Sequence, residues 1–351
     1  MDVTRFTHPI DLRAVSITDP FWQRETELVR REVIPYQWDA LNDRIPGAEK
    51  SWCMHNFRLA GRIMAQFRQQ GAQYTPQAYT YRGYNALPDD PAHPDEDKFY
   101  GFLFQDSDFS KWIEAVGYSL IQHPDEALEA TADEAIDVVC AAQTPEGYLD
   151  TYYIINGMDG VFQNLRDHHE LYCLGHLIEG AVSYYQATGK DKLLRAACRF
   201  ADYVADFFGT ADGQCKGYPG HEIAEMALVR LYEVTKDEKY LRLSRFFINE
   251  RGQEPNYFVE EERRNAEREH RPVRSVNLAY HQAVKPVREQ DEAIGHAVRA
   301  VYLYSGMADV ARMTGDDSLK SACERLWRSI VQEKLYITGG IGATQIGEAF
   351  S

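Results

Sequence analysis

The strongest constraint on the fold is a pair of amphipathic segments within residues 166–205. In the first segment, apolar side chains recur three and four positions apart from Leu171 to Tyr185, as they do on one face of an α-helix. The second segment follows a short turn at 188–191, whose sequence is TGKD. Two helices joined by so short a connection lie antiparallel, so this stretch predicts a helical hairpin.

The first segment also carries polar groups on the side opposite its apolar stripe. At roughly 100° per residue, His169, Cys173 and His176 fall on that side. A helix on the surface of a globule needs only one buried face, whereas a helix that lines a central cavity needs two. The histidines therefore either line a cavity or face water, and this helix alone leaves both interpretations open.

The same pattern recurs further along the chain. Three Gly-His pairs are each followed by a T-G/K-D turn and a segment with leucine and aromatic spacing, namely Gly175-His176, Gly220-His221 and Gly295-His296. We interpret each unit as a first helix, which contains the Gly-His pair and tyrosine, and a second helix beyond the turn. Unequal gaps between the units exclude a strict solenoid, but self-similar hairpins indicate a helical array. Histidines at equivalent places in successive hairpins could then meet at one rim.

The rest of the chain extends this array. Further helices are expected from Pro20 towards Trp38, and over residues 52–69, 101–121 and 125–143. Residues 70–99 are rich in Tyr, Pro and Asp and predict a long loop folded over a cleft, while the charge run at 260–274 predicts a solvated face or an insertion. About ten paired helices and almost no strands predict an all-α fold, an (α/α)6 toroid of helical hairpins.

Composition argues against several classes of function. The formal net charge of −16 and a pI of about 5.2 disfavour nucleic acid and anionic membranes as partners. No apolar run reaches the length of a membrane span, and the N-terminus lacks the basic region and apolar run of a signal peptide. The six cysteines are scattered and form no CxxC pair. We therefore expect a cytoplasmic protein.

A glycine-rich passage near the end of the sequence contains one acidic residue. The passage GGIGATQIGEAF resembles a phosphate loop only superficially, because it lacks the Lys-Ser/Thr pair and the strand–helix context, so nucleotide binding is rejected. Glu348 lies in this passage with few apolar neighbours in sequence. A carboxylate in such a loop can reach a substrate, or it can simply face water.

The residues themselves give no metal site. His169 and His176 are seven positions apart, roughly 10 Å along one helix, which is too far for both to bind one zinc ion. The motifs HExxH and Gly-x-Ser-x-Gly are absent.

Several motifs together carry a family resemblance. They are, in chain order, GFLFQDSDFSKWIEAVGYSL, EGYLDTYY, HHELYCLGHLIEGAVSYYQATG, YPGHEIAEMALVRLYEVT, INERGQEP, VREQDEAIGHAVRA and YITGGIGATQIGEAF. With them the sequence resembles the α/α-barrel domain of glycoside hydrolase family 127, the β-L-arabinofuranosidase group formerly called a domain of unknown function. The resemblance covers essentially the whole chain.

The resemblance implies a retaining hydrolase that removes terminal β-L-arabinofuranose, with an (α/α)6 catalytic barrel followed by β-sandwich domains. It implies that Glu348, in the GEAF motif, is the general acid/base. It also implies that His169, His221 and His296, in the HHELY, PGHE and GHAVR motifs, line the sugar pocket. His169 thus takes the place of His176 in the rim inferred from the repeats.

The resemblance also implies chemistry that this sequence does not supply. The family's nucleophile is a cysteine bound to zinc beside further cysteines and a glutamate, all downstream of the GEAF motif. Zinc is therefore expected in the complete enzyme, but none of the six cysteines here matches those motifs and no zinc ligand is assigned. We expect residues 1–351 to form a single catalytic α/α-barrel domain, incomplete at its C-terminal end and without the β-sandwich domains, that alone hydrolyses nothing measurable.

Two alternatives remain open from the sequence. One is a non-catalytic carbohydrate-binding toroid that binds sugar through the three histidines without any need for Glu348. The other is a different α/α-toroid enzyme, such as an unsaturated-uronide hydrolase or a sugar epimerase, with Asp106, Asp108 and Asp150 as candidate acids. The expected partners are a carbohydrate and, in a homodimer, a second copy of the chain.

Overall fold

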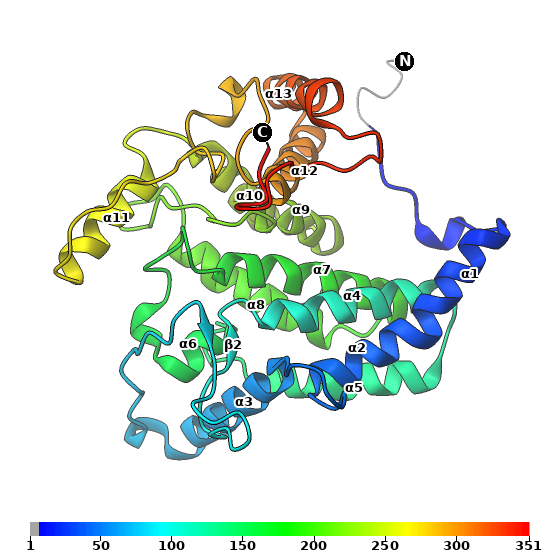
Figure 1. Cartoon of the computed structure of the whole chain (residues 1–351), viewed down its shortest axis with the longest axis vertical. Coiled ribbons are helices and arrows are strands. Elements are labelled where there is room, and N and C mark those ends of the chain that lie inside the picture. The colour runs from blue at the N-terminus through cyan, green and yellow to red at the C-terminus, as the bar shows by residue number, and fades with distance from the viewer. Residues whose placement is uncertain (1–6, 351) are drawn as a thin grey trace. The chain divides into compact units, whose positions relative to one another are not determined.

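The regular structure is almost entirely helical in the computed structural model, which describes residues 7–350 (Figure 1). Within that range the strands are β1 (Asn85–Ala86) and β2 (Gly101–Phe102), which form one short antiparallel pair. The predicted all-α class is therefore confirmed. The prediction about a signal peptide concerns residues 1–6 in part, and these lie outside the described residues. No helix in residues 7–350 is long and apolar enough to cross a membrane.

The chain divides into two compact units. Unit 1 comprises Met1–Val161 and His176–Tyr203, and unit 2 comprises Phe162–Gly175 and Val204–Ser351. Helices α7 (Glu170–Thr188) and α8 (Lys192–Phe207) each contribute residues to both units. The expectation of a single domain stays a prediction.

Unit 1 contains most of the helices expected in the first half of the chain. They are α1 (Pro20–Leu28), α2 (Ile34–Leu41), α3 (Cys53–Gln70), α4 (Asp106–Gln122), α5 (Glu126–Ala141) and α6 (Thr151–Asn156). Helix α3 packs against α4, α5 and α6. The carboxylates of Asp19 and Asp125 cap α1 and α5, accepting backbone N–H groups in the first turn of each helix.

The long segment at 70–99 packs in part on helix α6. The ring of Tyr79 is stacked on that of Tyr153, with ring centroids 5.6 Å apart, and backbone N–H of Thr80 donates to the carbonyl of Asn156. Its predicted role as a loop over a cleft stays a prediction.

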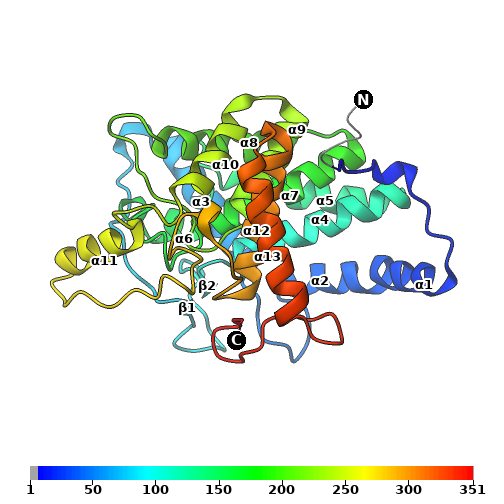
Figure 2. The same ribbon diagram turned by 90° about the horizontal axis from the view of Figure 1, so that it is seen from above.

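Unit 2 is built around two helical hairpins. The first pairs α9 (Ala224–Thr235) with α10 (Glu238–Glu250), and the second pairs α12 (Ala297–Thr314) with α13 (Asp317–Ser329). Helix α9 also packs against α12. Figure 2 shows α12 and α13 side by side.

The T-x-D signature explains why these hairpins turn where they do. Its middle residue, Lys236 or Gly315, has a left-handed backbone with φ of 60° or 68°, which ends the first helix. The aspartate that follows caps the second helix: Asp237 accepts the N–H of Lys239, and Asp316 accepts that of Ser318. One short motif therefore both stops a helix and starts the next.

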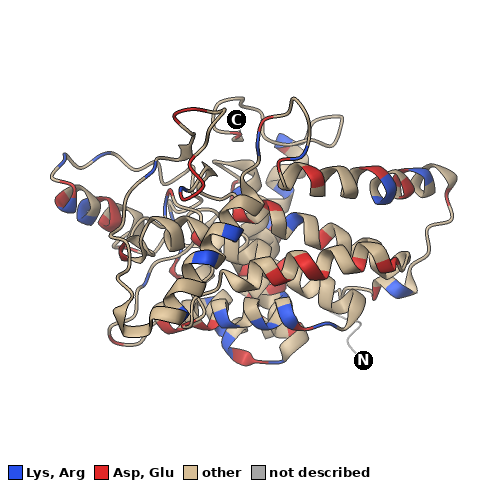
Figure 3. Ribbon diagram, turned by 90° about the horizontal axis from the view of Figure 1, so that it is seen from below, with Lys and Arg blue, Asp and Glu red and all other residues tan. Residues whose placement is uncertain are grey.

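The charge run at 260–274 differs in part from its prediction. It lies largely in α11 (Tyr257–Arg268), and Glu261 and Glu262 are buried. Glu262 is paired with Arg271 at 2.6 Å and accepts the N–H of Arg274. Much of the run is exposed, as a solvated face requires, but Glu261 and Glu262 are not, and buried carboxylates are tolerated when such partners satisfy them. Elsewhere acidic and basic residues are interspersed along the helices (Figure 3).

Candidate active site

The three histidines singled out from the sequence lie together in unit 2. The ring centroids of His169 and His221 are 5.4 Å apart, and those of His221 and His296 are 5.6 Å apart. His169 directly precedes α7, His221 lies in the loop before α9, and His296 is the N-cap of α12. The cluster therefore forms where three helices begin.

The position of these histidines corrects one detail of the repeat interpretation. Neither Gly220-His221 nor Gly295-His296 lies inside a helix, because the chain is still in an irregular conformation there. The glycines permit close backbone contact. A Cβ at Gly220 would lie 2.2 Å from the carbonyl oxygen of Leu165, and one at Gly295, where φ is +76°, would lie 2.0 Å from that of Ala279.

Hydrogen bonds to the ring nitrogens define which nitrogen carries the proton. Nδ1 of His169 lies 2.9 Å from the carbonyl of Asp167, and Nδ1 of His221 lies 3.0 Å from that of Glu222. Because a carbonyl only accepts, Nδ1 is the donor in both rings and Nε2 is the acceptor nitrogen. In His296 the arrangement is reversed, since its Nδ1 accepts the backbone N–H of Arg299 at 3.3 Å.

The cluster is uncharged at neutral pH. Burial is the main cause, and the charge of Arg299 the second, that lowers the pKa of His169 to about 3 and the pKa of His221 well below its ordinary value. The same two causes lower the pKa of His296. Nε2 accepts a hydrogen bond in His169 and His221 and donates one in His296. Such a set of neutral imidazoles suits the hydroxyl groups of a sugar, which both donate and accept hydrogen bonds.

Glu348 lies beside this cluster. Its Oε2 is 3.1 Å from Nε2 of His296, which donates the hydrogen bond because the other ring nitrogen already accepts one. The Glu348 side chain is 75% exposed, whereas that of His296 is 8% exposed. The backbone at Glu348 is left-handed, with φ of +48°. A solvent-accessible carboxyl held by a buried neutral imidazole is in a position to exchange a proton with a bound ligand.

The GEAF motif is tied to the start of α12 by its backbone. The carbonyl of Glu348 accepts the N–H of Ala297 at 2.9 Å, and the N–H of Phe350 donates to the carbonyl of Gly295 at 2.9 Å. His296 and Ala349 form an isolated antiparallel bridge. The two motifs GHAVR and GEAF thus hold each other, although 52 positions separate His296 from Glu348.

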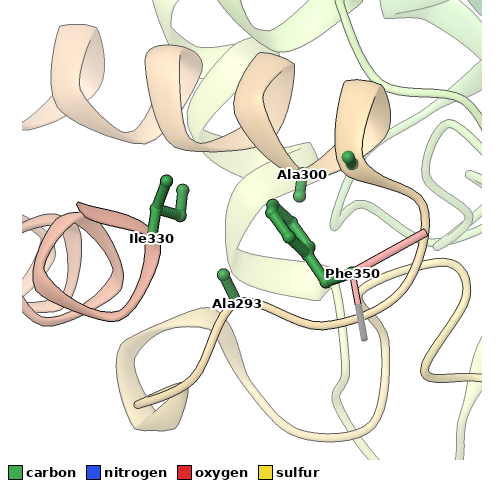
Figure 4. Packing of buried hydrophobic residues seen from close by; sticks show 5 residues of the cluster. Ala293, Ala300, Ile330 and Phe350 are labelled. Atoms are coloured by element: carbon green, nitrogen blue, oxygen red, sulfur yellow. The ribbon is translucent and has the colours of Figure 1, made fainter. Parts of the chain in front are cut away.

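Phe350 anchors the end of this motif. Figure 4 shows its ring among Ala293, Ala300 and Ile330. The residue is only 9% exposed. The aromatic residue of GEAF therefore fixes the position of the acid two residues before it.

Two buried groups that the sequence reasoning missed support the histidine loops. Arg251, which is fully buried, donates to the carbonyls of Pro219 and His281 at 2.6 and 2.8 Å. It also pairs with Glu222 at 2.8 Å and Glu225 at 3.2 Å. Burial raises the pKa of Glu222 to about 8 against the opposing charge of Arg251. This arginine belongs to the INERGQEP motif, which is visible in the sequence without indicating a role for Arg251.

Glu261 supports the loop before His169 in a similar way. Its carboxylate accepts the backbone N–H groups of Leu165 and Arg166 at 2.7 and 3.1 Å, and burial raises its pKa to about 7. In the sequence, Glu261 is one member of a charge run, so its supporting role can be recognised only from its burial in the structure.

The alternative acids have structural roles in unit 1. Asp106 accepts both the N–H and the hydroxyl of Thr151, at 2.7 and 2.5 Å, and burial raises its pKa to about 6. Asp108 accepts the side-chain amide of Gln105 at 2.6 Å, and Asp150 caps α6.

The residues described do not fit a zinc ion. Among residues 7–350, no group of three or more His, Cys, Asp and Glu side chains could hold a metal. Burial raises the pKa of the thiols of Cys53, Cys140 and Cys323, which favours the thiol over the thiolate that zinc binds.

Comparison with known proteins agrees with the family resemblance. The family model described as "Beta-L-arabinofuranosidase, GH127 catalytic domain" matches residues 14–351. The chain belongs to this family, glycoside hydrolase family 127. A non-reducing end β-L-arabinofuranosidase of Bifidobacterium longum subsp. longum is 37% identical over 344 residues, which are 96% of this chain and 49% of that protein.

Solved structures show the same fold. A family 127 β-L-arabinofuranosidase from Geobacillus stearothermophilus T6 is 46% identical with a TM-score of 0.82, over 96% of this chain and 48% of that one. A second family 127 β-arabinofuranosidase is 38% identical with a TM-score of 0.78, over 98% of this chain and 46% of that one. The chain spans about half the length of these relatives.

Proposed function

We propose that the protein to which this chain belongs is a retaining β-L-arabinofuranosidase that removes terminal L-arabinofuranose from glycans or glycoconjugates. Glu348 is the general acid/base, and His169, His221 and His296 bind the sugar. The observation that carries the proposal is the contact of an accessible carboxyl, Glu348, with a cluster of buried neutral imidazoles. Family membership and relatives that are 37% to 46% identical support the substrate class.

The geometry supports a division of labour in the reaction. The Glu348 carboxyl protonates the departing glycosidic oxygen and, as the carboxylate, later removes a proton from the attacking water. The Nε2–H of His296 orients this carboxyl in both steps. The acceptor nitrogens of His169 and His221 bind hydroxyl protons of the sugar. The family resemblance implies a zinc-bound cysteine nucleophile downstream of Glu348, and we assign that role to none of the residues 7–350.

Replacing Glu348 by Gln in the complete protein tests this function. We expect kcat on an alkyl β-L-arabinofuranoside to fall by a factor of about 100 to 10,000, because a poor leaving group needs the proton. On an activated aryl β-L-arabinofuranoside, whose leaving group needs little protonation, we expect a much smaller fall. The matched control is E324Q, an exposed glutamate on α13, which should leave both rates unchanged.

The outcome also separates the proposal from the sugar-binding alternative. Equal rates of E348Q and the wild type on both substrates contradict the acid/base role. A wild-type protein that binds L-arabinose through the three histidines but hydrolyses neither substrate favours the non-catalytic toroid.

We further propose that residues 1–351 are the N-terminal part of the catalytic domain and are inactive alone. The share of the relatives' length that the chain covers supports this proposal. A clear arabinofuranosidase rate from purified residues 1–351 would contradict it. A homodimer and a cytoplasmic location stay predictions.

A further inference from the structure

Arg299 lies close to the histidine cluster, with its guanidinium beside His281 and Tyr280. It is in the first turn of α12 and is 6% exposed. Within residues 7–350, no carboxylate lies within ion-pair distance of its guanidinium, and its Nε–H has no hydrogen-bond partner. Arg251, by contrast, contacts two carboxylates. A buried cation without such partners costs free energy, so packing alone does not account for an arginine here.

The contacts of Arg299 lead to the residues that hold Glu348. Its guanidinium carbon lies 4.7 Å from the ring centroid of Tyr280. That ring meets the His296 ring edge-on at 5.4 Å, and a Cβ built on Gly347 would lie 3.4 Å from it. Tyr280 thus contacts Arg299, His296 and the GEAF loop, and the guanidinium of Arg299 lies over its ring.

Arg299 also determines the state of a fourth histidine. Its Nη1 lies 2.7 Å from Nδ1 of His281, and the carbonyl oxygen of Gly220 lies 3.2 Å from the same nitrogen. Nδ1 cannot make both hydrogen bonds, because it would have to accept from the guanidinium of Arg299 and donate to the carbonyl of Gly220. A guanidinium only donates and stays protonated, so Nδ1 of His281 is the acceptor and its proton is on Nε2.

We propose that Arg299 is a positioning residue for Glu348: its guanidinium stacks on Tyr280 and holds that ring against His296 and Gly347. Its charge also adds to burial in opposing protonation of His296. His296 then meets the Glu348 carboxyl as a neutral hydrogen-bond donor rather than as an imidazolium. An imidazolium would form an ion pair that favours the ionised carboxylate, and a general acid must instead carry its proton to the leaving group. The inference rests on the proposed function of Glu348.

The groups around His296 are consistent with this role. Glu348 faces it from the C-terminal segment, Tyr280 from the preceding loop and His221 from the start of α9, while Arg299 shares α12. Among these, Glu348 favours the charged imidazole, whereas burial and the charge of Arg299 oppose it and together lower the pKa of His296.

The test combines two variants with a control on the same helix, all in the complete protein. R299M removes the positive charge, and R299K keeps the charge but lacks the planar guanidinium group with its several N–H donors. The control is R312M: Arg312 is also on α12, its side chain is 9% exposed, and it pairs with Glu233 and Asp309 away from the cluster. Nitrogen NMR of ¹⁵N-histidine-labelled protein reports the tautomer and the pKa of each ring, with His296 assigned from the loss of its signal in H296Q.

We expect wild-type His296 and His281 to carry the proton on Nε2 at pH 7. In R299M the pKa of His296 should rise, so that a larger fraction of its rings is protonated at a given pH. The kcat of R299M should then fall about 100-fold at pH 5.5, with a smaller fall at pH 8 and little change in KM. R299K should retain the wild-type titration and part of the activity, and R312M should match the wild type in both.

Several results would overturn the inference. One is a wild-type His296 or His281 with its proton on Nδ1, which decides the matter even if R299M fails to fold. Another is a folded R299M with wild-type histidine signals and a wild-type pH–rate profile. The NMR readout needs no substrate, so it tests Arg299 even if the protein proves not to hydrolyse arabinofuranosides, and an inactive wild type would count against the proposed function instead.

Discussion

Truncating Phe350 to alanine should release the segment that carries Glu348 while leaving the rest of the fold intact. A phenylalanine side chain buries about 200 Å², and Phe350 is 9% exposed among Ala293, Ala297, Ala300 and Ile330. At about 25 cal/mol per Å², this burial contributes about 4 to 5 kcal/mol. The two backbone hydrogen bonds that also attach the motif to α12 contribute about 1 kcal/mol each. The ring is therefore the larger attachment.

The loss should be local because the anchor lies in an irregular segment beside α12, which remains packed on α9 and α13. We expect hydrogen exchange at the backbone N–H of Ala297, which donates to Glu348, to accelerate by a factor of 100 or more, corresponding to about 3 kcal/mol. The midpoint of global unfolding should change little. In the complete protein, kcat should fall in parallel because Glu348 is no longer held beside His296.

Two variants serve as controls for this experiment. F350L keeps most of the apolar volume and should retain most of the protection and activity. I346A removes an apolar side chain of the same segment. Because the Ile346 side chain is 93% exposed, this change should alter neither the exchange protection nor the activity. If F350A retains wild-type exchange at Ala297 and wild-type kcat, the reasoning that this ring positions the acid is refuted.

Three further predictions concern the support of the cluster. G220A should lower the free energy of unfolding by about 2 to 3 kcal/mol in urea titrations, because the new Cβ meets the carbonyl oxygens of Leu165 and Arg166 at 2.2 and 2.3 Å. The control G339A, where φ is +84° and the space around the glycine is open, should lower it by only about 1 kcal/mol. Equal losses in the two variants would argue against the clash. R251M leaves Glu222 and Glu225 buried without their cation and should destabilise the fold by about 3 to 5 kcal/mol in the same titration, whereas a cost below about 1 kcal/mol would show that the pair contributes little. The pKa of His169 is lowered to about 3 in the folded state, so the unfolded state binds this proton first as the pH falls through 6.5, and stability is lost below that pH. Between pH 7 and 5 the wild type should therefore lose about 2 kcal/mol more than H169N, and parallel stability curves would contradict the lowered pKa.

The sequence predicted those parts of the structure that local patterns determine. Apolar periodicity located the helices, and the T-x-D turns located the hairpins because one residue ends a helix and the next begins another. The repeats predicted a rim of His176, His221 and His296, whereas the family resemblance named His169 in place of His176, and it is the ring of His169 that contacts that of His221. The assignment of His169, His221 and His296 to sugar binding and that of Glu348 to acid/base catalysis stay predictions from family resemblance.

What the sequence could not predict depends on burial and on contacts between distant positions. Nothing local distinguishes Glu261 from its charged neighbours in α11, although its carboxylate accepts two backbone N–H groups of the loop before His169. Arg251 and Arg299 are ordinary arginines in sequence, and only their depth among carbonyls and imidazoles gives them a role. The Gly-His pairs were placed inside helices because the helical period continues through them, whereas close backbone contacts at Gly220 and Gly295 keep the chain irregular there.

The location of the histidines at the starts of α7, α9 and α12 has a consequence for how such a site can change. Each histidine lies at a separate helix start, whereas α9 and α12 pack against each other and against α10 and α13 along the helices. Under the proposed function, we expect a substitution of one histidine side chain to change one contact with the sugar, whereas a substitution of the neighbouring Gly220 or Gly295 would disturb the backbone packing as well. Under the same proposal, we expect relatives with the same helices to differ in sugar preference through single replacements among these three histidines.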